Sequence, residues 1–461
     1  MSVVSNDPAT ASTHVDVVPK GIKLSWGSGA LGVAILLNAI AFTAMFFMVQ
    51  VLGLDPGIAG TVVFLSKIMD IISDPLVGKW SDQYKTSGSR RRPFMLYGTF
   101  ISAFSFTMIF TAPEFSTQWI TAAYMFLALT IYTIGYTLFN VTYLSMPAEM
   151  TDDYHERTSI HGYRMAFVGV GGLLGQAGIP FVQGIFGANE PKTYVFIGLV
   201  GSVIILISML TAYFGTAKAR FSKAAVEKME FINEYKIVLR NRHFLRVLGI
   251  KAAQLFGVAG ISVTTLFFFE KILQVNLQVL ATVGFIVFVF TLASIPVFVR
   301  ISKVIGKAKT YAIAGLIYVV SALSWVLSVP GEPEWAIYLR YALTGISVSG
   351  NVVMAMSMLT DCIEYDARKT GVRREGVYTA LYSFVEKFTF ALAPLIIGFA
   401  LSLAGYTREL SLDQITPAIR QAILLGMSYI PAAMGVVAIV LLLGYKLTEE
   451  ELHNVGAEHE E

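Results

Sequence analysis

Long apolar blocks recur along the chain, separated by short polar stretches. A helix needs about 20 apolar residues to cross the hydrocarbon core of a bilayer, and the blocks reach that length. We therefore predict an all-α membrane protein with twelve transmembrane helices. Their expected positions are 24–52, 57–80, 93–112, 118–146, 161–187, 193–215, 245–270, 276–300, 310–329, 335–359, 377–405 and 420–446.

The stretch 216–244 is charged and amphipathic and divides the spans into two groups of six. The halves resemble each other weakly, because 75–81 (PLVGKWS) and 296–302 (PVFVRIS) close the second span of each half. Two pseudo-symmetric six-helix bundles form the architecture of the major facilitator superfamily. The predicted organisation is a tail (1–23), a bundle (24–215), a middle loop (216–244), a second bundle (245–446) and a tail (447–461).

Composition supports a membrane protein. The chain is 55% hydrophobic and 14% charged, whereas soluble domains carry about 25% charged residues. A net charge of +3 is too small to suggest a nucleic-acid partner. The single cysteine, Cys362, excludes a disulfide framework and a thiolate metal cluster. The first 20 or so residues lack the apolar stretch of a cleaved signal, so we expect the N-terminus to be retained.

Lysine and arginine concentrate in the loops after even-numbered spans and in the two termini. The opposite loops hold few of them. Such a bias marks the cytoplasmic side, so both termini are expected to face the cytoplasm, in the plasma (inner) membrane. The basic loops include Arg90, Arg91 and Arg92; Arg220, Lys223, Lys236, Arg240 and Arg242; Arg300, Lys303, Lys307 and Lys309; and Arg368, Lys369, Arg373 and Arg374.

Three ionisable residues lie within the second span. Lys67, Asp70 and Asp74 follow at intervals of three and four, which places them on one helical face. Each ionisable group in a span costs about 2.5–3.5 kcal/mol and calls for a partner or a function. Because Lys67 offsets only one negative charge, the face is left near −1, which Na⁺ or a proton would neutralise. Alternatively, Asp74 only caps a loop interaction.

Other polar residues stand inside the spans. Tyr136, Thr137 and Asn140 lie in the fourth span, where the Thr137 hydroxyl suits Na⁺ but interhelical hydrogen bonding is the alternative. Lys387 lies near the middle of the eleventh span and needs an anion, from an aspartate or a substrate.

The seventh span carries Lys251 and Gln254, and Arg164 opens the fifth. Lys251 either reaches the membrane interface or faces the substrate. Arg164 is either an interface anchor or a gate residue.

Four stretches together resemble the glycoside–pentoside–hexuronide:cation symporters, the melibiose permease-like branch of the major facilitator superfamily. The resemblance runs from about residue 21 to 446. The stretches are KLSWGSGALG from Lys23; KIMDIISDPLVGKWSD with RRRPF; YTLFNVTYLSMPAEMTDD with ERT and YR; and TDCIEYDARKTGVRREG followed by YSFVEKF.

The resemblance implies roles for individual residues. Asp70 and Asp74 match the family's paired cation-site aspartates, and Thr137 matches a residue that helps to select Na⁺. Lys387 matches a lysine close to both the cation and substrate sites. Lys67 replaces a basic residue, usually arginine, on the same face of the second span.

Arg164 matches an arginine that the family places at the start of the fifth span. Galactoside-binding members carry acids where this chain has Ala34 and Asn140, and tryptophans where it has Leu144 and Val352. Galactoside specificity therefore does not transfer.

We expect a secondary active transporter that couples Na⁺ or H⁺ to symport of a sugar, glycoside or uronate, without another cofactor. The alternative cargo is an amphipathic organic anion or a lysolipid-like solute. A membrane-embedded enzyme is disfavoured because the chain has no HExxH and no GxxxxGK[ST] motif. A transporter-like sensor that moves no solute would have no need of the aspartate pair. The presence of the pair therefore argues against a sensor. We expect a monomer whose partners are the solute, the cation and the bilayer.

Charged residues beside the basic loops predict a cytoplasmic gate. Single exposed ion pairs are worth about 0–1 kcal/mol, so a network would be required. The expected members are Asp82, Arg90, Arg91, Arg92, Glu149 and Arg157.

Overall fold

The computed structural model describes residues 17–84, 91–151, 153–219, 231–372, 374–445, 447 and 451. In these residues all regular structure is helical. Twelve helices are long and apolar enough to cross a membrane, which confirms the predicted number and the all-α fold.

The first six spans form the N-terminal half. Two of them contain π-helical segments, η1 in the first span and η2 in the fifth. The spans are α1–η1 (Lys20–Phe46 and Phe47–Val51), α2 (Pro56–Gln83), α3 (Arg92–Phe110), α4 (Gln118–Met150), α5–η2–α6 (Tyr154–Leu173, Leu174–Gly178 and Ile179–Phe186) and α7 (Pro191–Gly215).

The last six spans form the C-terminal half, after the short helix α8 (Phe231–Val238). They are α9–η3 (Arg242–Phe268 and Phe269–Leu273), α10 (Val279–Ile305), α11–η4 (Lys307–Ser324 and Trp325–Leu327), α12 (Glu334–Thr370), α13 (Glu375–Leu403) and α14–η6–α15 (Pro417–Leu424, Leu425–Tyr429 and Ile430–Leu443).

Several helices extend beyond the apolar blocks that predicted them. The span expected at 335–359 runs to Thr370, where Gly371 ends it with a φ of +70°. The expected middle loop contains α8, and α9 already begins at Arg242. Hydropathy detects only the part of a helix inside the hydrocarbon, whereas backbone hydrogen bonds carry the helix into the polar zone.

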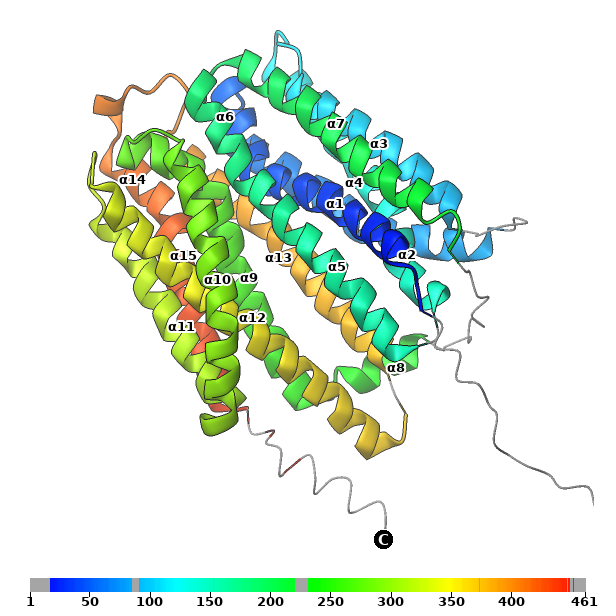
Figure 1. The fold of residues 1–461 in the computed structure, drawn as a ribbon. Coiled ribbons are helices and arrows are strands. Elements are labelled where there is room, and N and C mark those ends of the chain that lie inside the picture. The colour runs from blue at the N-terminus through cyan, green and yellow to red at the C-terminus, as the bar shows by residue number, and fades with distance from the viewer. Residues whose placement is uncertain are drawn as a thin grey trace, which may run out of the picture.

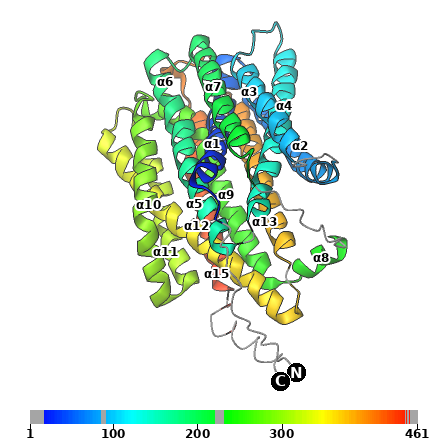
Figure 2. The ribbon, with the colours of Figure 1, turned by 45° about the vertical axis from the view of Figure 1, so that its right-hand side comes forward.

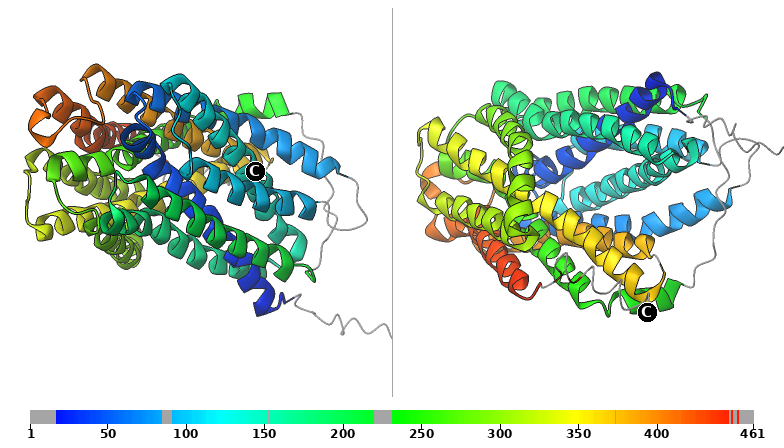
Figure 3. Two further views of the ribbon diagram at one scale, coloured as in Figure 1. Left: turned by 90° about the horizontal axis from the view of Figure 1, so that it is seen from above. Right: turned by 60° about the horizontal axis from the view of Figure 1, so that its bottom comes forward.

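The two halves lie side by side, the first coloured blue to green and the second green to red (Figure 1). The same grouping is visible after rotation (Figures 2 and 3). The most extensive contacts between the halves of the described chain are those of α2 with α13, α1 with α9, and α5–η2–α6 with α10. Within each half the helices pack mainly on one another, for example α3 on α4 and α10 on α12.

Because the number of spans is even, α1 begins and α15 ends at the same end of the molecule. We call this the tail end, and the opposite end the hairpin end. Near the hairpin end α2 and α13 approach closely at Gly60, where an added Cβ would overlap the carbonyl oxygen of Pro394. This close packing fixes α2, with its aspartates, against α13, with its lysine.

Candidate functional site

The central feature is an ammonium group held between two carboxylates. Lys387 Nζ of α13 lies 2.5 Å from Asp74 Oδ2 and 3.1 Å from Asp70 Oδ2, both of α2. The helical spacing of the aspartates turns both toward α13, as their intervals predicted. The site therefore joins the two halves through one cation and two anions.

Hydroxyl groups complete this cluster on the side of α4. Thr137 Oγ1 donates to Asp74 Oδ1 at 3.0 Å and lies 3.3 Å from Asp70 Oδ1. Ser73 Oγ is 3.1 Å from Thr137 Oγ1. Carboxylate and hydroxyl oxygens are the ligands that hard cations such as Na⁺ prefer. Asp70, Asp74 and Thr137 thus converge on a common point, now shared with the Lys387 ammonium.

The charge balance differs from the sequence-based expectation. Lys67 makes no ion pair with a described residue and instead lies 5.9 Å from the centroid of the Tyr132 ring. Lys387 supplies the direct counter-charge. With both lysines near both aspartates the cluster is neutral without a bound cation, rather than at −1.

The exposure of the two aspartates differs along α2. The Asp70 side chain is 4% exposed, whereas the Asp74 side chain, one turn nearer the tail end, is 35% exposed. Charged side chains in a span face the bundle interior or water. This gradient indicates that water reaches the aspartates from the tail end.

On α4, the polar residues form a connected face beside the cluster. The Tyr136 ring centroid lies 5.9 Å from Lys387 Nζ. Asn140 Nδ2 donates to Tyr136 Oη at 3.1 Å, while Asn140 Oδ1 is buried and has no partner among the described residues. Both predicted residues are thus adjacent to the aspartate–lysine cluster.

Lys251 packs against α13. Its Nζ lies 3.5 Å from Glu386 Oε2 and 4.6 Å from the centroid of the Tyr382 ring. Gln254 is buried one turn further along α9. Lys251 is therefore directed into the protein, where Glu386 balances its charge. Its charge can be explained without placing the side chain at the membrane interface.

Arg164 is partly buried against α4. It is close to Tyr143 of α4 and to His161 of its own helix. Arg164 Nε is buried without a partner among the described residues. Tyr143 stacks on Trp26, with ring centroids 4.6 Å apart.

A second polar cluster, which the sequence analysis missed, joins the halves at the hairpin end. Glu270 of η3 accepts hydrogen bonds from Gln50 of η1 at 3.3 Å and from Asn189 at 3.0 Å. Tyr406 Oη donates to Gln50 Oε1 at 3.0 Å. The available signal was an acid inside the apolar run LFFFEKIL at the end of the seventh span.

Two further contacts join the halves at this end. Ser402 Oγ donates to Asp55 Oδ2 at 2.7 Å, and Arg408 Nη1 donates to the Val51 carbonyl at 3.3 Å. Beside them, Arg408 and Asp55 help to line a pocket of 420 Å³. The hairpin end is therefore held shut by polar contacts between the halves.

At the tail end the described ion pairs of the N-terminal half stay within that half. Arg91 Nη1 lies 2.8 Å from Glu149 Oε1, and Lys23 Nζ lies 2.7 Å from Glu156 Oε2. The predicted gate residues are thus partly brought together, on one side of the contact between the halves.

The remaining gate residues bind backbone groups or cannot be placed. Arg92 donates to the Tyr213 carbonyl at 2.7 Å, and Arg157 donates to the Thr151 carbonyl at 2.9 Å. Arg90 and the Asp82 side chain lie outside the described residues.

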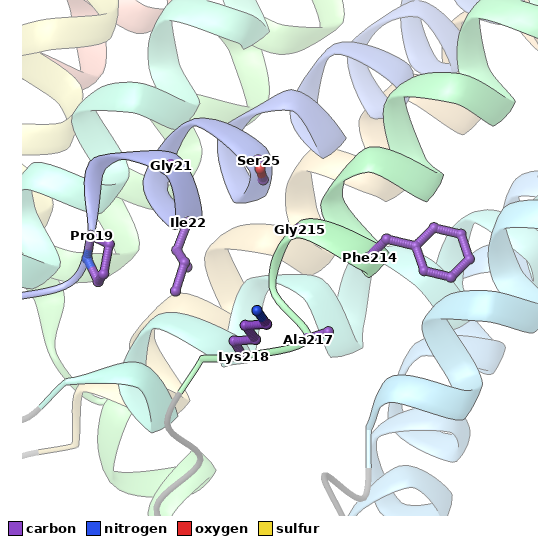
Figure 4. Close-up of a pocket in the computed structure, with 8 residues that line it drawn as sticks. All are labelled: Pro19, Gly21, Ile22, Ser25, Phe214, Gly215, Ala217 and Lys218. Carbon is purple, nitrogen blue, oxygen red and sulfur yellow. The ribbon is translucent and has the colours of Figure 1, made fainter.

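A pocket of 610 Å³ lies at the tail end between the start of α1 and the end of α7 (Figure 4). Its lining is mostly apolar, with Lys218 as the charged side chain. It belongs to the N-terminal half alone and is separate from the cluster around Lys387.

The family model and the similar proteins all indicate one family of transporters. The family described as "MFS/sugar transport protein" matches residues 25–449. The putative glycoside/cation symporter YagG of Escherichia coli is 24% identical, over 94% of this chain and 93% of that protein. The E. coli glucuronide carrier protein homolog is 27% identical, over 91% and 92%. A putative 2,3-dihydroxypropane-1-sulfonate exporter of E. coli is 27% identical, over 97% and 96%.

The fold also matches solved transporters. A bacterial homologue of the human lysosomal transporter Spinster, in an inward-facing and unoccupied conformation, superposes with a TM-score of 0.67. The two chains are 13% identical over 97% of this chain and 98% of the other. This match confirms the major facilitator fold.

Proposed function

Because the chain belongs to the MFS/sugar transport protein family, we propose that it couples Na⁺ or H⁺ to symport of a sugar, glycoside or uronate. The resemblance to the glycoside–pentoside–hexuronide:cation symporters is confirmed, so the chain is a multi-pass transporter and not an enzyme. The observation that carries the proposal is the Lys387 ammonium bound to both Asp70 and Asp74. We also propose that the protein is a plasma-membrane monomer with cytoplasmic termini.

The cluster acts as a neutralisation switch in this proposal. Without a cation Lys387 and Lys67 together balance the charges of the two aspartates, and the empty carrier can reorient. Na⁺ or a proton occupies the same carboxylate oxygens and displaces the ammonium. Lys387 is then free to bind a substrate oxygen, so cation and substrate favour each other's binding. Such a coupling free energy acts equally in both directions.

The contacts between the halves support alternating access. The hairpin end is closed through Glu270, Asp55 and Arg408, while Asp74 is more exposed than Asp70 toward the tail end. With cytoplasmic termini, this arrangement corresponds to the inward-facing state. Transport then requires these hairpin-end contacts to break while the tail end closes.

Glu270→Gln should shift the carrier toward opening at the hairpin end. Two donors from the N-terminal half and the Lys271 ammonium of the same segment converge on the Glu270 carboxylate, and hydrogen bonds to a charged group are worth about 1.5–3 kcal/mol. In a Cys362→Ala background, a cysteine at Ser73 should react with an impermeant thiol reagent from the hairpin end at least about fivefold faster. The matched control is Glu409→Gln, an exposed acid at the same end. Equal labelling rates in the two variants would contradict the proposal that the contacts of Glu270 hold the hairpin end closed.

Neutralising the tail-end pair should have a smaller effect. The double change Arg91→Gln with Glu149→Gln removes two charges, now paired within the N-terminal half, that we propose join an ion-pair network between the halves when the tail end closes in the outward-facing state. Because such a pair is worth about 0–1 kcal/mol, labelling of the same cysteine from the tail end should rise up to about fivefold. Unchanged labelling would reject these loops as a gate.

The proposed function is tested first by cation binding to the purified, substrate-free protein. Na⁺ titration and pH titration should reveal one saturable cation site that disappears in Asp74→Asn. A wild-type protein that binds neither cation specifically would refute cation coupling.

The second candidate cargo, an organic anion, is favoured by one observation. Arg164 carries a positive charge without an ion-pair partner among the described residues. Two relatives with 27% identity are named for a glucuronide and a sulfonate, which supports an anionic cargo without assigning it to this chain.

A further inference from the structure

The pocket between the start of α1 and the end of α7 is an apolar hollow with one basic side chain. Its volume is 610 Å³, and Ile22 and Lys218 are among the side chains that line it (Figure 4). The two helices cross closely beside it, because a Cβ added to Gly215 would overlap Ser25. The ring of Phe214, at the border of the pocket, is 64% exposed. The pocket therefore opens beside an apolar outer surface of α7.

That surface is a stripe of exposed apolar side chains along α7. Leu199, Val203, Ile207 and Phe214 lie on one helical face, and each is more than half exposed. On a membrane-spanning helix such a face is covered by acyl chains. One leaflet takes half of a hydrocarbon core of about 30 Å, so one acyl chain covers about ten residues of helix. A chain that begins at the pocket therefore reaches about as far as Val203.

Positive charge surrounds the mouth of the pocket. Lys20 begins α1 beside the lining residues, and Lys218 follows the end of α7. Both side chains are exposed, and neither forms an ion pair with a described residue. Glu156, an acid at the same end, is already paired with Lys23 at 2.7 Å. Arg92, which donates to a backbone carbonyl near the end of α7, adds a third positive charge. The mouth thus offers two lysines to an anion.

We propose that this pocket binds an anionic phospholipid, with the headgroup phosphate at Lys218 and Lys20 and one acyl chain in the pocket and along the stripe of α7. The apolar run of α7 ends at Gly215 and Lys218 follows within one turn, which places the lysine at headgroup level. Basic hollows between spanning helices bind anionic headgroups on the cytoplasmic side. The proposed ligand is a lipid and not a cargo, so the site does not depend on symport.

The test compares two lipids with the same acyl chains and different net charge. Native mass spectrometry of the full-length, delipidated protein would follow titration with phosphatidylglycerol and with phosphatidylcholine. Each lysine near an anionic headgroup strengthens binding about fivefold, so the first phosphatidylglycerol should bind at least about tenfold more tightly than phosphatidylcholine. Lys218→Gln should reduce this preference about fivefold. The matched control is Lys303→Gln, an exposed lysine at the tail end of the C-terminal half, which should leave it unchanged.

A second variant tests the hollow itself. A Cβ added to Gly21 meets no atom within 4 Å, so Gly21→Trp would fill the pocket without crowding the helices. It should weaken the binding of the first phosphatidylglycerol at least about fivefold, and it carries the test if Lys218→Gln does not fold. Glycerol 3-phosphate, which has the phosphate but no acyl chain, should not compete with the lipid.

Four results would overturn the inference. They are equal affinity for the two lipids, an unchanged preference in Lys218→Gln, unchanged lipid binding in Gly21→Trp, and competition by glycerol 3-phosphate at the concentration of the lipid. The last result would assign the lysines to a soluble phosphate.

Discussion

Replacing either Asp70 or Asp74 with asparagine is expected to abolish concentrative uptake. A tenfold inward cation gradient stores about 1.4 kcal/mol, enough for about tenfold accumulation in a one-to-one symporter. Asparagine leaves only one carboxylate beside Lys387, so the ammonium can satisfy the site and no cation is needed to replace it. The inside-to-outside solute ratio in proteoliposomes should fall from about ten to about one.

The matched control for these variants is Asp361→Asn. Asp361 also binds a lysine, Lys307, at 2.6 Å, but at the tail end within the C-terminal half. This variant should retain accumulation. Full accumulation by both Asp70→Asn and Asp74→Asn, in protein that reaches the membrane folded, would rule out the cation role of the pair.

Lys387→Ala should remove most of the coupling between cation and substrate. In the wild type the cation displaces an ammonium 2.5–3.1 Å from the carboxylates, and the released lysine then serves the substrate. Coupling factors are typically 5–150-fold, so we expect the cation to tighten substrate binding by at least about fivefold. In the variant this factor should approach one, because there is no ammonium to transfer.

The coupling is measured as a thermodynamic cycle. Substrate affinity is determined with and without the cation, and cation affinity with and without the substrate. In the wild type the two factors must agree. Lys307→Ala removes a lysine that is paired with a single carboxylate, Asp361, away from the cluster, and it should keep the wild-type factor. If Lys387→Ala also keeps it, Lys387 is only a packed helix residue with a satisfied charge.

Much of the architecture could be predicted because it depends on local pattern. Apolar length alone identified all twelve spans, and the intervals between Asp70 and Asp74 placed both on one face. Lys387 lies 313 residues from Asp74, and spacing cannot bring such distant residues together. The resemblance to the symporter family predicted that Lys387 lies close to the aspartates, and the distances in the structure agree with that prediction.

Other features depend on tertiary packing and could not be read from the pattern. The contacts of Glu270 with Gln50 and Asn189 join segments that lie far apart in the sequence, so no local pattern indicates them. Lys67 makes no ion pair with a described residue, and its position 5.9 Å from the centroid of the Tyr132 ring depends on the packing of α2 against α4. The roles of these residues in transport stay predictions until the variants are measured.

Solute uptake into proteoliposomes under an imposed cation gradient tests the symport proposal most directly. The solute would first be selected by a thermal-shift screen of sugars, uronates and amphipathic anions with and without Na⁺. Uptake would then be followed under a tenfold Na⁺ gradient, under a one-unit pH gradient and with no gradient. Symport predicts accumulation of about tenfold under at least one gradient and none in its absence. Equilibration to the same ratio of one under all three conditions would contradict cation-coupled transport.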